Sequence, residues 1–405
     1  MEALKLILIF AAIVIALRRN VSIGVTLFGA GLLTAVIYWL PVDQLLEGYR
    51  DLLTSRRFLS LTGVIVSITV LGNLLKESGY LGRLTKACQG LRGGSRTAAI
   101  MMPALVGLMP MPAGSYLSAP LVNSVLDHDK HSPHFRCAVN YWFRHMVEFS
   151  WPVYPGLILT EAITGMPIAT VSLLQFPMTV IMFILGLIFL ARHIDTSGTN
   201  RQRLWSSIVG IAGAIWPVVL AIALYGILKI ELFLAMVVSL ILVMIVTRSP
   251  RSALFLALRK GLSPKLVFLV FGILSFQMVL ELTGSIESIP RLAEAYNLPE
   301  SIVIILVCFT AGLLTGMVAA YVGLGYTLLA GLLYQPVLNP ANILLAYLSG
   351  FIGMMLSPTH LCLIVTNEYF GSDLSKVYKV LAIPVLLLGV FGFLLYISGY
   401  GSLIG

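Results

Sequence analysis

The feature that most constrains this chain is an apolar run that breaks in its middle. Residues 104–120 read ALVGLMPMPAGSYLSAP, with Pro110, Pro112, Gly114 and Ser115 at the centre. Proline removes a backbone donor and clashes with the preceding turn, so two prolines close to a glycine end a helix here. Inside a bilayer, broken backbone is tolerated only where protein buries it or water reaches it. The run therefore predicts either a short loop at a membrane surface or a binding site at membrane depth.

Apolar residues dominate the rest of the chain as well. Of 405 residues, 59% are hydrophobic and 11% are charged, whereas soluble domains carry about 25% charged residues. The first apolar run ends at Arg18-Arg19-Asn20 and not at a small-residue cleavage site, which predicts a retained span instead of a signal peptide. The chain is thus predicted to be an all-α polytopic membrane protein with about ten transmembrane helices. The candidate spans are 4–17, 21–41, 58–76, 137–163, 166–192, 203–227, 230–247, 264–282, 341–370 and 376–402.

The net charge of +9 comes from Lys and Arg residues that lie in short loops between the apolar runs. In such loops basic residues act as topology signals, so they do not indicate nucleic-acid binding. Loops 77–96 and 248–265 are rich in Lys and Arg and are expected in the cytoplasm. Loop 283–299 has Arg291 as its one basic residue and is expected on the outer side of the membrane. These patterns predict a multi-pass protein of the cytoplasmic (inner) membrane. Its expected partner is the lipid bilayer, and no nucleic-acid partner is expected.

A shift of 209 residues superposes landmarks of the two halves of the chain. By loop charge, span 58–76 runs from outside to inside, and its counterpart 264–282 runs the opposite way. This arrangement predicts two inverted-topology repeats, from which many secondary transporters are built. The superposed pairs are Pro41 with Pro250, Gly63 with Gly272, Gly107 with Gly316, and Gly114 with Gly323.

The repeat divides the chain into a short first helix (1–20), a first repeat (21–192), a linker with a connecting helix (193–229) and a second repeat (230–405). Each repeat contains one segment expected to form a re-entrant hairpin and one broken helix. The hairpins are 97–126 and 306–335, and the broken helices are 137–163 and 341–370. Interrupted segments in corresponding positions of two halves are the best sequence pointer to a transporter's binding site.

The two hairpin tips are candidate substrate contacts. At the first tip, exposed amides and a helix N-terminus would suit an anionic group. At the second tip, glycines allow close backbone approach, although small residues also mediate helix packing in membranes. The candidates are Pro110, Pro112, Ala113, Gly114 and Ser115 in the first tip, and Gly323 and Gly325 in the second.

The first broken helix carries Arg144, His145 and Glu148 within an otherwise apolar run. Charge inside a membrane is costly and faces a cavity or a partner. Arg144 and Glu148 can form a structural pair one turn apart. In the functional alternative, Arg144 binds the substrate anion, and Glu148 or His145 carries the coupling ion or proton.

The second broken helix is interrupted at Ser357-Pro358-Thr359-His360. The residues Ser357, Pro358 and Thr359 are candidate substrate contacts at this break. His360 is either a hydrogen-bonded packing residue or a second candidate for the coupling proton.

The sequence predicts no metal site and no cofactor. The loop DHDKHSPHF offers Asp127, Asp129 and several histidines, but no second ligand cluster accompanies it, and a solvated connector is the better interpretation. The four cysteines are scattered and are expected to serve packing. No HExxH, GxSxG or Walker sequence occurs, so ATP-driven transport and these classes of hydrolase find no support.

The motifs GLMPMPAGSYLSAP, NYWFRH and LSPTHLCLIVTNEYFG resemble a family of prokaryotic integral membrane proteins defined as a domain of unknown function. The resemblance covers essentially the whole chain. More distantly, the order of hairpins and broken spans resembles the ion transporter superfamily, including the gluconate permeases, which also have Glu-Tyr-Phe-Gly after a polar break. At the break this chain has Pro358, Thr359 and His360 where that family tends to have Asn and Asp, so neither substrate nor coupling ion carries over. The resemblance implies an elevator-type secondary transporter that is commonly a homodimer.

The expected function is secondary active transport of a small organic anion, with a carboxylate favoured, coupled to H⁺ or Na⁺. This interpretation makes the chain a carrier and not an enzyme. A sodium/proton antiporter on the same scaffold is one alternative. The other is a protein that transports or chemically modifies a lipid-linked substrate, with Ser357 and His360 as a nucleophile–base pair.

Overall fold

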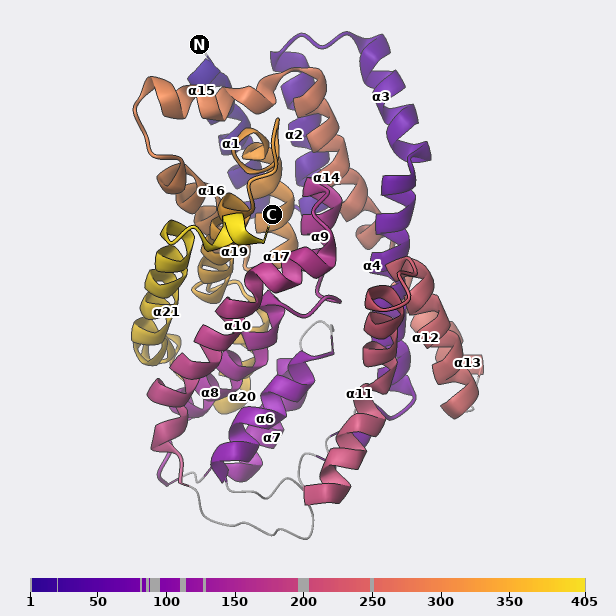
Figure 1. Cartoon of the computed structure of the whole chain (residues 1–405), viewed down its shortest axis with the longest axis vertical. Helices are drawn as coiled ribbons and strands as arrows, with labels where there is room; N and C mark the ends of the chain where they lie inside the picture. Colours follow the sequence, from indigo (N-terminus) through magenta and orange to yellow (C-terminus); the bar gives the residue numbers. More distant parts are fainter. Residues whose placement is uncertain are drawn as a thin grey trace.

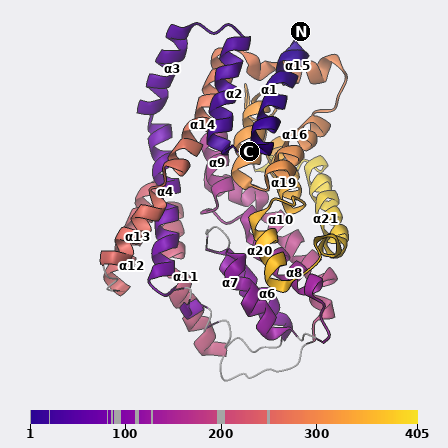
Figure 2. The same cartoon turned by 180° about the vertical axis from the view of Figure 1, so that it is seen from behind.

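The computed structural model describes residues 2–19, 21–80, 82–84, 87, 95–109, 114–126, 129–195, 204–247 and 251–404. All regular secondary structure within these ranges is helical, which confirms the all-α class. The helices are arranged along one long axis (Figures 1 and 2), with α15 (Ser288–Ala295) near one end and α6 (Ser95–Gly107) with α7 (Ser115–Val125) near the other. Helices α21 (Leu374–Ile397) and α13 (Arg251–Gly261) lie on opposite sides of this axis.

Within the described ranges, five helical segments are long and apolar enough to cross a membrane: Arg56–Glu77, Ile168–His193, Trp205–Gly226, Ser252–Leu282 and Leu374–Ile397. Shorter apolar helices add Ile23–Ile37, Leu232–Thr247, Glu300–Thr315, Pro340–Met355 and Leu361–Phe370. A chain with this many apolar helices has the build of a multi-pass membrane protein. The number of ten spans stays a prediction.

The helices of the first half follow one another with few long connections. They are α1 (Glu2–Arg18), α2 (Ile23–Ile37), α3 (Val42–Thr54), α4 (Arg56–Glu77), α6, α7, α8 (Pro133–His145), the 3₁₀ turn η1 (Met146–Phe149), α9 (Pro155–Thr164), α10 (Ile168–Phe189) and η2 (Ala191–His193). Helix α11 (Leu204–Gly226) then leads to the second half.

The second half begins with α12 (Leu232–Thr247), α13 and α14 (Pro264–Leu282), followed by η4 (Ser285–Glu287) and α15. It continues with α16 (Glu300–Thr315), α17 (Val318–Ala320), the π-helical η5 (Tyr321–Tyr326), α18 (Ala330–Leu333), α19 (Pro340–Met355), α20 (Leu361–Phe370), α21 and η6 (Tyr400–Leu403). Equivalent elements start at similar offsets: α2 and α12 are 209 residues apart (23 and 232), and α8 and α19 are 207 apart (133 and 340). The division into two inverted repeats stays a prediction.

Two apolar segments are divided by breaks that proline explains. Helix α8 starts at Pro133 behind a Ser132 cap and ends at His145, and the chain resumes a helix only at Pro155. Helix α19 starts at Pro340 behind an Asn339 cap and ends at Met355, and α20 starts at Leu361, after Pro358. Proline fits the first turn of a helix, where its missing N–H costs nothing. Prolines inside other helices, such as Pro177 in α10 and Pro384 in α21, do not interrupt them. We call residues 144–154, which include the last two residues of α8, the first break, and residues 356–360 the second break.

Candidate functional site

The first break holds a buried ion pair. Arg144 Nη1 donates to Glu148 Oε1 over 3.1 Å, and both side chains are less than one-tenth exposed. The same Nη1 donates to the hydroxyl of Tyr154 over 3.4 Å. Breaking a buried ion pair is strongly destabilising because the remaining charge has neither water nor a partner. The pairing that the sequence left as one alternative is therefore present.

The guanidinium of Arg144 also contacts the start of α7. A Cβ added to Gly114 would lie 2.9 Å from Nη2 and 3.0 Å from Nε of Arg144, closer than a side chain can approach. The backbone of Gly107 packs against the Arg144 carbonyl, and Tyr154 donates a short hydrogen bond to the Gly107 carbonyl. Glycines at these two positions allow the α6–α7 pair to close on the arginine.

The electrostatics at this contact are one-sided. A helix N-terminus carries partial positive charge and attracts anions, and here a cationic side chain lies against it. Ser115, the first residue of α7, is fully buried, and its hydroxyl has no hydrogen-bond partner among the described residues. The Glu148 carboxylate balances one positive charge. The paired guanidinium, the helix N-terminus and the Ser115 hydroxyl thus lie at the same place.

The two breaks meet through a pair of histidines. Nε2 of His145 lies 3.0 Å from Nε2 of His360. The other ring nitrogen of each residue faces a backbone carbonyl: His145 Nδ1 is 2.7 Å from the Tyr141 oxygen, and His360 Nδ1 is 2.6 Å from the Gly316 oxygen. A backbone carbonyl therefore fixes the orientation of each imidazole, and the two Nε2 atoms face each other.

Further contacts fix the crossing of the breaks. Tyr141 donates its hydroxyl to the Met355 carbonyl over 3.1 Å, and Tyr347 donates to the Glu148 carbonyl over 3.1 Å. The rings of Phe149 and Phe351 lie 4.1 Å apart. These bonds join α8 and η1 of the first half to α19 of the second, so the two breaks are positioned as one unit.

The second break carries hydroxyls instead of charges. Ser357 Oγ lies 2.8 Å from Thr359 Oγ1 and accepts from the Thr359 amide over 3.3 Å. Neither ring nitrogen of His360 contacts Ser357, because they face His145 and Gly316. The contact that a nucleophile–base pair of Ser357 with His360 would need is thus not formed in this structure. Thr359 borders a cavity of about 400 Å³ that Thr315 and Lys265 also line.

The remaining predicted substrate contacts are spread over different surroundings. Pro110, Pro112 and Ala113 lie outside the described residues, and Pro358 is exposed within the second break. Gly323 and Gly325 lie inside η5, where an added Cβ would meet Ile273 and Cys308 respectively. These two glycines pack against side chains and not against the Arg144 pair.

Sequence reasoning missed Cys362. Its sulfur and the ring nitrogens of His145 and His360 all lie within 4.8 Å of one another, and all three residues are buried. The signal was present as His360-Leu361-Cys362 directly after a helix break. It was not recognised because the third ligand, His145, is 215 residues from His360 in the sequence.

The histidine-containing loop before α8 forms a different kind of structure. In its described part, Lys130 Nζ donates to Asp195 over 2.8 Å, and this bond lowers the pKa of Asp195 below its usual range. His131 Nε2 lies 3.2 Å from the His193 carbonyl. Asp127 and His128 lie outside the described residues, and the described remainder of the loop forms no cluster of three metal-ligating atoms.

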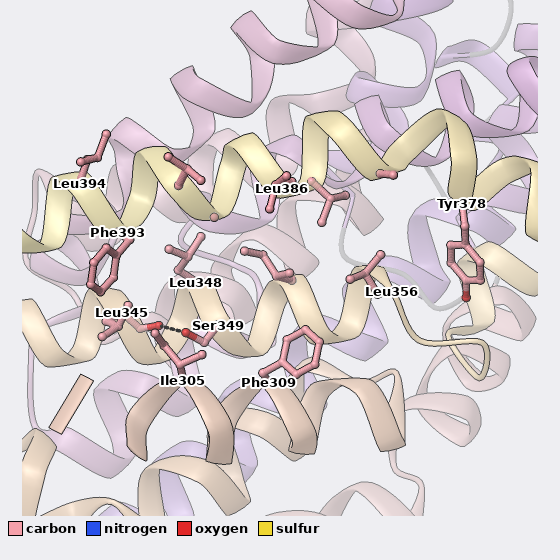
Figure 3. Close-up of a pocket in the computed structure, with 15 residues that line it drawn as sticks. Ile305, Phe309, Leu345, Leu348, Ser349, Leu356, Tyr378, Leu386, Phe393 and Leu394 are labelled. Atoms are coloured by element: carbon pink, nitrogen blue, oxygen red, sulfur yellow. Dashed lines mark hydrogen bonds between the residues drawn. The ribbon is translucent and has the colours of Figure 1, made fainter. Parts of the chain in front are cut away.

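A large apolar groove lies apart from these polar groups. It has a volume of about 790 Å³ and runs between α16, α19 and α21 (Figure 3). Ser349 turns its hydroxyl to the Leu345 carbonyl over 2.7 Å, and Tyr378 supplies the other polar side chain of the lining. With no charged group in its wall, the groove suits hydrocarbon and not a small anion.

The apolar helices and the buried polar crossing of two broken helices define the class as a multi-pass membrane protein with a polar centre. Over residues 3–398 the chain matches the family described as protein of unknown function (DUF401), and it belongs to that family. No curated protein matches the chain.

Proposed function

We propose that the protein is a secondary transporter of a small organic anion, with a carboxylate as the expected charged group. In this proposal the two halves form inverted repeats, and the α6–α7 pair and its counterpart in the second half are re-entrant hairpins. The substrate is held between the first hairpin and the first break, and a proton or sodium gradient across the cytoplasmic membrane drives its movement. The carrier works as an elevator-type homodimer.

The observation that carries this proposal is the contact between Arg144 and the start of α7. Two positive groups, a guanidinium and a helix N-terminus, converge on Gly114, and Glu148 balances only one of them. A buried surplus of positive charge is unfavourable unless an anion completes it. The Ser115 hydroxyl at this position supplies an additional donor.

The chemistry selects a carboxylate over a larger anion. A planar guanidinium recognises a carboxylate through two parallel hydrogen bonds. A doubly charged phosphate would need more positive charge than one guanidinium that already pairs with Glu148. Ser357 and Thr359 at the second break are proposed to bind the uncharged part of the substrate, because their hydroxyls can donate and accept.

The first experiment is thermal unfolding of the purified full-length protein with a panel of small carboxylates, sugar acids and inorganic ions. A ligand that binds only the folded state stabilises it by about 2.7 kcal/mol at a hundredfold excess over Kd. Gly114→Ala places a methyl group against the guanidinium and should weaken binding of any hit by at least about tenfold, equivalent to about 1.4 kcal/mol. Gly323→Ala, at the corresponding position of the second half, is the matched control and should leave the affinity unchanged.

Uptake of the labelled ligand into proteoliposomes then identifies the driving ion. An imposed sodium gradient and an imposed pH gradient are applied separately, and only the coupled one should concentrate the anion. If no carboxylate stabilises the protein or is taken up, or if Gly114→Ala and Gly323→Ala weaken binding equally, the proposed anion site is wrong.

One observation favours the sodium/proton antiporter as the second candidate. The Arg144–Glu148 pair is complete without any substrate, so the charge at the first break can be structural. An antiporter would collapse a pH gradient in proteoliposomes when sodium alone is added, with no organic anion present. Such collapse, together with silence across the organic panel, would replace the anion carrier by the antiporter.

A further inference from the structure

The His145–His360 contact poses a hydrogen-bonding problem that the two side chains cannot solve alone. Each Nδ1 faces a backbone carbonyl at 2.7 or 2.6 Å, and a carbonyl oxygen only accepts. Both Nδ1 atoms must therefore carry the ring proton. In the neutral imidazoles this leaves a bare lone pair on each Nε2, and these two atoms lie 3.0 Å apart. Two acceptors in contact repel each other unless a cation lies at this position.

Cys362 adds a third atom to the same point. Its sulfur lies within 4.8 Å of both histidine ligand atoms, and it comes from the first turn of α20, two residues after His360. A neutral thiol offers one S–H, which can satisfy one of the two lone pairs but not both. Three buried groups thus present two nitrogen lone pairs and one ionisable sulfur toward a common centre.

From this arrangement we propose that His145 Nε2, His360 Nε2 and Cys362 Sγ bind one transition-metal ion of the Zn²⁺ class. Two imidazoles and one thiolate form a ligand set of the softness that zinc and its neighbours prefer over Ca²⁺ or Mg²⁺. When the metal binds, the Cys362 thiol loses its proton to solvent, and the sulfur becomes an anionic ligand. This inference stands on the ligand geometry and does not depend on anion transport.

The dimensions of the cluster suit such an ion. Tetrahedral coordination with Zn–N bonds of 2.0–2.1 Å places two nitrogen ligands about 3.4 Å apart, a small widening from the 3.0 Å between the Nε2 atoms. The carbonyls of Tyr141 and Gly316 act as outer partners that fix the tautomer and the ring orientation, as they do for most metal-binding histidines. His360 and Cys362 are each 8% exposed, so the centre is buried but retains an edge for metal entry.

The site also joins the two halves of the protein. His145 ends α8 in the first half. In the second half, His360 is the residue before α20, and Cys362 lies in the first turn of α20. A metal at this place therefore links the first break directly to the second. Three protein ligands leave a fourth tetrahedral position. The Glu148 carboxylate lies close to it, with Oε1 3.9 Å from His145 Nε2.

The test uses the full-length protein, purified in detergent, freed of metal with a chelator and titrated with Co²⁺ and then Zn²⁺. Cobalt is a spectroscopic substitute for zinc, and a bound thiolate gives a near-ultraviolet charge-transfer band. We expect this band to rise to one equivalent per chain and to vanish when Zn²⁺ displaces Co²⁺. Absence of the band in folded wild-type protein would overturn the proposal and indicate a proton shared between the two histidines instead.

Variants then assign the ligands. Cys362→Ser removes the thiolate at nearly constant volume and should weaken Zn²⁺ binding by more than about 100-fold, because even outer-shell partners contribute 10–100-fold. His360→Asn should do the same, while Cys308→Ser, at a buried free cysteine outside the cluster, should leave the affinity unchanged. Undiminished binding in Cys362→Ser would place the metal elsewhere and overturn the assignment. If Cys362→Ser does not fold, the charge-transfer band of the wild-type protein decides the question alone.

Discussion

The two halves of the protein use the same backbone device with different chemistry. Gly107 ends α6 and packs against the carbonyl of Arg144, and Gly316 ends α16 and packs against the backbone of His360. In both halves a glycine thus lets a helix, α6 or α16, approach a break. The next pair of corresponding glycines differs, because Gly114 contacts the Arg144 guanidinium whereas Gly323 contacts the side chain of Ile273.

This difference shows where the buried charge lies. The first break combines a full positive charge with a full negative charge in a buried setting. The second break offers neutral hydroxyls and an imidazole. Because charge is far more costly to bury than a hydroxyl group, only one of two similar scaffolds carries it. Of the two breaks, the first therefore holds the buried ion pair.

The strongest test of this asymmetry is Arg144→Met. It leaves Glu148 buried and unpaired, and we expect a loss of about 3–5 kcal/mol in the free energy of unfolding, measured as a lowered Tm in detergent. Arg291→Met is the matched control, since Arg291 also pairs with a glutamate one turn away but both side chains are more than half exposed. Exposed pairs of this kind contribute at most about 1 kcal/mol.

A double variant sharpens the same prediction. Arg144→Met combined with Glu148→Met replaces the ion pair by apolar groups and should regain much of the lost stability, because both charges are removed together. If Arg144→Met lowers Tm no more than Arg291→Met does, then water reaches Glu148. In that case the first break does not depend on its ion pair for stability.

Gly316→Ala tests the shared backbone device with an intermediate effect. Gly316 has a φ of +63°, and an added Cβ would lie 2.6 Å from the His360 nitrogen. The left-handed conformation alone costs about 1–2 kcal/mol for an alanine, and the backbone contact should add roughly 1–3 kcal/mol by overpacking. Thermal unfolding measures the sum.

Gly371→Ala isolates the conformational part of that cost. Gly371 ends α20 with a φ of +58°, and nothing lies within 4 Å of its added Cβ. We therefore expect a smaller loss of Tm for Gly371→Ala than for Gly316→Ala. Equal losses would show that the contact between α16 and the second break is loose, and the likeness of the two halves would end at their helix order.

Much of this architecture is visible in the sequence, and the reasons are local. Pro155 begins α9 and Pro358 precedes α20, so both mark a break. Proline alone does not fix a break, because Pro103, Pro177 and Pro384 lie inside helices. The apolar runs predict the helical class from composition alone. The sequence left open whether Arg144 pairs with Glu148 or binds an anion. The i, i+4 spacing allows the two side chains to touch, but it does not reveal which other groups face them.

What the sequence could not provide are contacts between residues far apart in the chain. The meeting of His145 with His360, and the addition of Cys362, depend on how α8 and α20 cross. Likewise, Gly323 and Gly114 occupy corresponding positions, yet only the packing reveals that one contacts an isoleucine and the other an arginine. Periodicity and spacing carry no information about such partners.

The smallest predicted effect concerns the starts of the two equivalent helices. Ser132 Oγ accepts from the Phe135 amide over 3.4 Å at α8, and Asn339 Oδ1 accepts from the Asn342 amide over 3.1 Å at α19. Replacing either cap by alanine should cost about 1 kcal/mol, with the smaller drop in Tm for Ser132→Ala because its bond is longer. Similar small losses would mean that both halves anchor their broken helices alike. If Ser132→Ala lowers Tm nearly as much as Arg144→Met does, the stability of the first break depends on the start of α8. The Arg144–Glu148 pair would then not distinguish the first break from the second.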